Sequence, residues 1–164
     1  MSKQLLVALS LILGALPLNS FAQLSAEIKT QLHQSAKESL PDFIDFLSLP
    51  NDAYQPAQLE PNIEWAEKAF GDLGFTTQRV PTKGIDLLFA ERQFKKAKKT
   101  ILFYVQIDGQ PVDPRSWHQG SPFKPVVKAQ NANGDWKIID TESLKGELDP
   151  EWRIFARSAS DAKG

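Results

Sequence analysis

The stretch of sequence on which the fold prediction depends is TILFYVQIDG, residues 100–109. Its residues 101–105 are consecutive apolar side chains without a charge, proline or glycine. A continuous apolar run of this length is typical of a strand covered on both faces, as in a parallel sheet flanked by helices. A second run of this kind occupies residues 86–91. We therefore predict an α/β fold with a mainly parallel sheet flanked by helices.

A helix is expected near the start of the folded chain. Ser25 is a good N-terminal cap, and apolar residues recur at helical spacing as far as residue 36 and again over residues 40–47. Pro41 falls between these two stretches. We expect there either a kink or a break, with Ser39 capping a second short helix.

A further helix is expected from Pro61 to Leu73. Proline is tolerated in the first turn of a helix, and Gly74 is suited to the left-handed conformation that ends one. Residues 75–80 then follow as a strand. Downstream, a hairpin is predicted over residues 126–140, because Asn133 and Gly134 form a preferred two-residue turn.

Two more segments complete the chain. Residues 107–124 are rich in proline and glycine and are predicted to form a long irregular loop, a kind of segment that is often functional. Residues 152–156 are predicted to form one further strand.

The charge of the chain excludes one class of partner. Its 19 basic and 20 acidic residues give a net charge of −1, without the basic excess of a nucleic-acid-binding domain. Four lysines lie between the two apolar runs, and we interpret them as a solvated turn, with an anion-binding patch as the alternative: Lys95, Lys96, Lys98 and Lys99.

The first residues have the pattern of a secretory signal. A basic start precedes an apolar run over residues 5–16, and small residues stand at Ser20 and Ala22. We predict a signal peptide over residues 1–22 and a periplasmic or secreted protein, with residues 23–164 as the remaining domain. The alternative is a membrane anchor, but the run is shorter than the roughly 20 residues that a spanning helix needs. No membrane contact is expected after cleavage.

Two carboxylates follow predicted strands. Asp108 lies two residues past the strand over residues 100–106, and Asp161 lies five residues past the strand over residues 152–156. Polar groups beyond the carboxyl ends of strands converge on ligand sites in open α/β sheets. The pair could bind a divalent metal or act in acid/base chemistry. The alternative is that each carboxylate caps a local turn.

Two motifs carry a family resemblance. The string LFYVQIDGQPVDPRSWHQGSPFKPVVK, followed later by WRIFARSASDAKG, resembles the zinc metallopeptidase family of aminoacylase, acetylornithine deacetylase, succinyl-diaminopimelate desuccinylase, glutamate carboxypeptidase and carnosinase-type dipeptidases. In that family one strand ends in H-x-D and a later strand runs into G-R-G-x-x-D-x-K-G. The resemblance covers about residues 25–164 and implies the N-terminal portion of a two-metal exopeptidase-like catalytic domain.

The resemblance also implies roles for individual residues. Asp161 matches the carboxylate that bridges two divalent ions, and Asp108 matches the acid that orients the metal ligand two residues before it. The ions would be Zn²⁺ or, as alternatives, Mn²⁺, Co²⁺ or Mg²⁺. They would polarise the scissile carbonyl and activate a water. The implied substrate is a small peptide or an N-acyl amino acid.

The chain departs from this pattern in three places. Gln106 stands where the family has a metal-binding histidine, and an amide oxygen is a poorer zinc ligand than imidazole. Ala156 and Ser158 stand where the family has glycines. The family's glutamate base and remaining ligands all follow the position that matches Gly164. We therefore expect an N-terminal, truncated part of the catalytic domain that is inactive alone.

Three readings remain open on the sequence. The first is the N-terminal part of an exported metal-dependent hydrolase, whose full-length form could be a homodimer. The second is a non-catalytic periplasmic binding protein that kept the fold after losing a metal ligand at Gln106. The third is a chain that does not fold stably alone. The two histidines are expected to lie outside the site, His33 on a helix and His118 in the loop. The alternative for His118 is that it replaces the metal-binding histidine that is missing at position 106.

Overall fold

The computed structural model of the 164-residue chain describes residues 25–164. The signal peptide predicted over residues 1–22 lies outside the described residues. The chain divides into two units, Met1–Ala36 and Lys37–Gly164, and the architecture below belongs to the second unit except for the start of the first helix. Within residues 25–164, no helix has the length and apolarity that crossing a membrane requires.

Helix α2 extends over Ala26–Ser48. The expected cap is confirmed, because the Ser25 hydroxyl accepts a hydrogen bond from the backbone N–H of Ile28 at 3.2 Å. Of the two alternatives expected at Pro41, a kink or a break, the break with a new cap at Ser39 is wrong, since the helix continues through Pro41. A proline in a helix removes its own N–H bond but keeps a helical φ, so the helix can continue where packing supports its end. Phe46 and Leu47 provide that packing because both are buried.

Helix α3 extends over Pro56–Asp72, so it begins five residues before the predicted start at Pro61. Its predicted end is confirmed. Gly74 has a φ of 78°, and Phe75 donates its backbone N–H to the carbonyl of Phe70 at 3.0 Å. The rings of Phe70 and Phe75 then meet edge to face, with centroids 5.4 Å apart. This is a Schellman cap with its hydrophobic contact.

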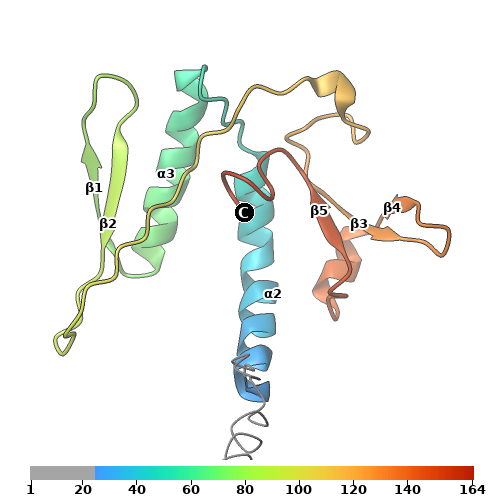
Figure 1. Ribbon diagram of the computed structural model, residues 1–164, viewed down its shortest axis with the longest axis horizontal. Coiled ribbons are helices and arrows are strands. Elements are labelled where there is room, and N and C mark those ends of the chain that lie inside the picture. The colour runs from blue at the N-terminus through green and yellow to red at the C-terminus, as the bar shows by residue number, and fades with distance from the viewer. Residues whose placement is uncertain (1–24) are drawn as a thin grey trace, which may run out of the picture. The chain divides into compact units, whose positions relative to one another are not determined.

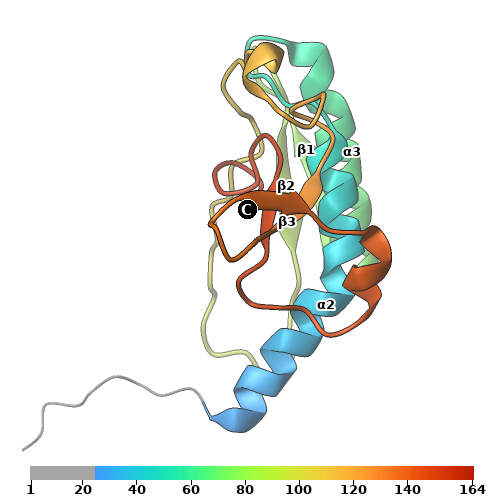
Figure 2. The same ribbon diagram turned by 90° about the vertical axis from the view of Figure 1, so that its right-hand side faces the viewer.

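The strands form two small antiparallel sheets. One pairs β1 (Thr76–Val80) with β2 (Leu87–Glu91), and the other has the order β4 (Trp136–Ile138), β3 (Val126–Gln130), β5 (Arg153–Phe155). Figures 1 and 2 show the β1–β2 hairpin along α3. The predicted mainly parallel sheet flanked by helices is therefore wrong. The connection over residues 81–86 is too short for a parallel crossover and closes a hairpin instead.

The apolar runs are not buried strands either. In β2, exposure alternates along the strand, and Leu87 is 62 % exposed because α3 covers only one face. Residues 100–106 form no strand, and Tyr104 is 89 % exposed. An apolar run becomes a strand only where another strand supplies hydrogen bonds, and no segment within residues 25–164 pairs with this one.

Several local predictions are confirmed. The β3–β4 hairpin forms as predicted, but its connection is residues 131–135 and not a two-residue turn at Asn133 and Gly134. Gly134, with a φ of 85°, donates its N–H to the carbonyl of Asn131 at 2.9 Å. The strand predicted over residues 152–156 is β5, and residues 107–124 are irregular apart from one turn of 3₁₀ helix, η1, at Pro114–Ser116. A second 3₁₀ helix, η2, covers Thr141–Lys145.

An ion-pair cluster joins α3 to the β1–β2 hairpin. The Arg79 guanidinium on β1 donates to Glu60 at 2.8 Å and to Glu67 at 2.7 Å, both on α3. The hydrogen bond from Arg79 holds the pKa of the Glu67 carboxyl below its ordinary value. The buried apolar side chains come from α2, α3, β3 and the C-terminal segment: Phe46, Leu47, Leu59, Ile63, Ala66, Val127, Ala156 and Ala162.

Candidate functional site

The candidate site forms where three loops meet: the end of α2, the segment after residue 106 and the turn after β5. Asp52 and Gly109 form one isolated parallel bridge. Gly109 donates its N–H to the carbonyl of Asn51 at 2.6 Å, and its own carbonyl accepts from Ala53 at 2.8 Å. These two bonds fix the backbone directly after Asp108.

Asn51 holds the three loops together. This residue is only 1 % exposed. Its side-chain amide nitrogen donates to the carbonyl of Ile107 at 2.8 Å and to the hydroxyl of Ser158 at 3.0 Å. Gly109 is required beside it, because a Cβ there would lie 2.9 Å from the Ser158 hydroxyl. One buried amide thus connects the segment bearing Asp108 to the turn bearing Asp161.

The turn after β5 has an unusual backbone. Ser158 has a φ of 67°, in the left-handed region that favours glycine, and its carbonyl accepts from the N–H of Lys163 at 3.1 Å. Arg157 packs over the turn, donating to the carbonyl of Gln110 at 2.9 Å and lying 3.5 Å from the Asp161 carboxylate. The turn therefore presents Asp161 at its surface next to the loop after residue 106.

All three predicted site residues line one small hollow of about 180 Å³. Gln106 and Asp161 are exposed, whereas Asp108 is half-buried. The remaining residues of the hollow are Ala53, Tyr54, Gly109 and Gln110. Asp108 and Asp161 thus come together as the sequence patterns suggested, although the parallel sheet that was expected to align them does not form.

The donors in this hollow are oxygens: two carboxylates and the amide of Gln106. Oxygen donors suit hard cations such as Mg²⁺ or Mn²⁺ better than Zn²⁺. Across residues 25–164, no three His, Cys, Asp or Glu side chains gather closely enough to hold a metal ion. The hollow thus has two carboxylates and one amide among its lining residues, and both metal ions implied by the family resemblance stay a prediction.

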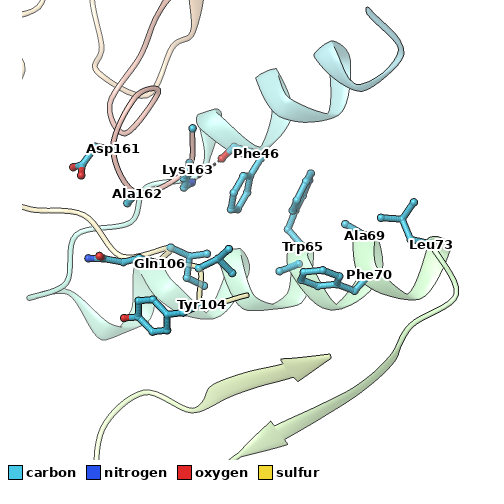
Figure 3. A pocket seen from close by; sticks show the side chains of 14 residues that line it. Phe46, Trp65, Ala69, Phe70, Leu73, Tyr104, Gln106, Asp161, Ala162 and Lys163 are labelled. Atoms are coloured by element: carbon cyan, nitrogen blue, oxygen red, sulfur yellow. Dashed lines mark hydrogen bonds between the residues drawn. The ribbon is translucent and has the colours of Figure 1, made fainter. Parts of the chain in front are cut away.

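A larger apolar hollow of about 530 Å³ shares Gln106 and Asp161 with the first one. Figure 3 shows the rings of Phe46 and Trp65 on its wall, stacked with centroids 4.2 Å apart. The Lys163 amine lies beside them and donates to the carbonyls of Phe46 at 2.7 Å and Leu49 at 2.8 Å. Burial lowers the pKa of this amine to about 8.

The histidines do not take part. His118 is exposed and lines neither hollow. The structure therefore gives no support to His118 as a replacement for the metal-binding histidine that the family has at position 106. His33 is an exposed residue of α2. Sequence reasoning missed Asn51, which stands in no recognisable spacing. It also assigned no role to Arg157, although this residue matches the arginine of the family motif G-R-G-x-x-D-x-K-G. The glycine of the family motif at position 158 was the one signal of the left-handed backbone there.

Comparisons with protein-family models, curated proteins and solved structures found no match to this chain. The family resemblance therefore rests on the motifs around Asp108 and Asp161. The lining of the hollow is an observation that does not depend on this resemblance.

Proposed function

We propose that this chain contributes Gln106, Asp108 and Asp161 to the site of a metal-dependent hydrolase of peptide or N-acyl amide bonds. The observation that carries the proposal is the convergence of these three side chains on one hollow. They come from two segments about fifty residues apart in the sequence, joined by the buried amide of Asn51.

Two backbone features support the proposal because they fall on glycine positions of the family motif. The left-handed φ of Ser158 lies at one of them. Gly164 lies at another, where an added Cβ would clash with the Ala159 carbonyl oxygen. The turn that carries Asp161 thus has the backbone constraints that such a glycine pattern would serve.

Each side chain has a role that its exposure allows. The exposed Asp161 carboxylate and Gln106 amide oxygen would hold the cation, and the half-buried Asp108 would orient the Gln106 side chain. A divalent cation bound there would polarise the carbonyl of the scissile amide. Among the residues that line the hollow there is no glutamate or histidine to move a proton. Binding and orientation are therefore the roles assigned to this chain.

The neighbouring apolar hollow indicates the kind of substrate. It shares Gln106 and Asp161 with the polar hollow and is walled by Phe46 and Trp65. A small peptide or N-acyl amino acid with an apolar side chain would place its amide at the carboxylates and that side chain against the rings. Such a substrate fits an enzyme of the periplasm or the extracellular space, to which the predicted signal peptide would direct the chain.

Calorimetric titration of the purified chain with Mn²⁺, Mg²⁺ and Zn²⁺ tests the proposal. We expect one saturable site that prefers Mn²⁺ or Mg²⁺, and we expect Asp161→Asn to weaken the binding by at least about tenfold. Asp135→Asn, which removes an exposed carboxylate on the β3–β4 hairpin, serves as the matched control. Equal binding by both variants, or no binding by the unmodified chain, would rule the proposal out.

The alternative is a non-catalytic periplasmic binding protein. Gln106 favours it, because an amide in place of a histidine weakens metal binding and still leaves a polar hollow for a peptide. The same calorimeter separates the two functions. Binding of an apolar dipeptide in the presence of EDTA would support the binding protein, whereas dipeptide binding that requires the cation would support the hydrolase.

A further inference from the structure

The segment over residues 101–105 is an exposed apolar run. Its five side chains, which include Phe103, are between 67 % and 89 % exposed. Within residues 25–164, the backbone of residues 100–106 takes part in no backbone hydrogen bond. Such a segment, with strand-forming side chains, unpaired backbone groups and no proline or charge, is a template for pairing with another chain.

We propose that a second copy of this chain pairs with the segment as an antiparallel strand centred on Phe103. In an antiparallel pair, side chains that lie directly opposite each other point to the same face of the sheet. A two-fold axis can therefore relate two identical antiparallel strands only when one residue lies opposite its own copy. Phe103 is the middle residue of the apolar run. Centring the pair there places Ile101 opposite Val105 and Leu102 opposite Tyr104, so every apolar residue has an apolar partner.

The charges flanking the run support the same register. With Phe103 at the centre, Lys98 of each copy lies opposite Asp108 of the other, which gives one opposite-charge pair at each end. A parallel pairing in register would instead set the lysines of residues 95–99 against their own copies. Like charges directly opposite are destabilising. The charge pattern therefore favours the antiparallel arrangement.

The hydrogen bonds after residue 106 indicate which edge is free. The carbonyl of Ile107 accepts from Asn51, and both backbone groups of Gly109 are bonded to residues 51–53. Since backbone groups point to alternate edges along an extended strand, the even-numbered residues face the opposite edge. Leu102 and Tyr104 would therefore exchange hydrogen bonds across the pair, and the two Phe103 residues would form the closer, non-bonded pair.

Light scattering over a concentration series, in EDTA, tests the proposal through the mass of the chain. We expect a monomer–dimer equilibrium. Lys98→Asp should raise the dissociation constant about tenfold, because it places like charges at both ends of the pair. The double variant Lys98→Asp/Asp108→Lys should restore the original dissociation constant. The control Lys95→Asp makes the same charge change opposite Pro111 and should leave the mass unchanged.

Amide exchange at a dimeric concentration gives a second measurement. Leu102 and Tyr104 should exchange slowly and Phe103 quickly. A chain that stays monomeric, aggregates that ignore the charge reversal, or a double variant that does not recover the dimer would each overturn the proposal. Because EDTA removes any cation from the hollow that Asp108 lines, these outcomes are independent of the metal titration above.

Discussion

The side-chain amide of Asn51 and the hydroxyl of Ser158 are joined by a 3.0 Å hydrogen bond across 107 positions of the sequence. Both residues are buried, and the Asn51 nitrogen also donates to the carbonyl of Ile107. This arrangement sets the spacing between Asp108, one residue after Ile107, and Asp161, three residues after Ser158. The candidate site therefore depends on a contact between two side chains that are assigned neither cation binding nor catalysis.

Replacing Asn51 tests that dependence. Asn51→Ala leaves the Ile107 carbonyl and the Ser158 hydroxyl without their donor in a buried place, which costs about 1–3 kcal/mol. We expect the free energy of unfolding to fall by this amount and the urea concentration at the midpoint to fall in proportion. The exposed Gln93→Ala should change the free energy of unfolding by less than about 0.5 kcal/mol. If the two variants unfolded at the same urea concentration, Asn51 would not hold the loops together.

Two glycine substitutions should have opposite effects. Gly109→Ala places a Cβ 2.9 Å from the Ser158 hydroxyl oxygen and 3.0 Å from the Asn51 amide nitrogen, so we expect a loss of about 1–3 kcal/mol in the free energy of unfolding. Gly71→Ala in α3 meets nothing within 4 Å and should stabilise the chain by up to about 1 kcal/mol. Thermal unfolding of both variants measures the difference, and a gain at residue 109 would contradict the close packing described here.

The contact between α3 and β1 should depend on pH. Because the hydrogen bond from Arg79 lowers the pKa of Glu67, this carboxylate contributes stability above the ordinary pKa of 4.5 and loses it as the pH falls through its lowered value. Arg79→Gln removes that contribution. We therefore expect the variant to be less stable than the unmodified chain at neutral pH, with the difference disappearing at low pH.

Urea unfolding at a series of pH values measures this difference. Lys137→Gln is the control, because it removes one exposed positive charge from β4 without touching α3. A stability difference for Arg79→Gln that stayed constant down to pH 2 would show that Glu67 is not responsible.

The features that could be predicted from the sequence are those in which the interacting groups lie within a few residues of one another. The Ser25 cap, the Gly74 helix end and the β3–β4 hairpin with its left-handed Gly134 each follow from the backbone preferences of a short segment. They form because the local hydrogen bonds need no contribution from distant residues. The start of α3 was misplaced because Pro56 and Pro61 are both compatible with a helix start.

The sequence by itself thus determined the local elements and identified Gln106, Asp108 and Asp161 as candidate site residues. Tertiary structure decided which strands pair, and so turned residues 86–91 into a hairpin strand and left residues 100–106 without a partner. It also brought the three site residues to one hollow through Asn51. The physical reason is that an apolar run records only the tendency to be buried, whereas the partner that buries it and supplies its hydrogen bonds comes from elsewhere in three dimensions.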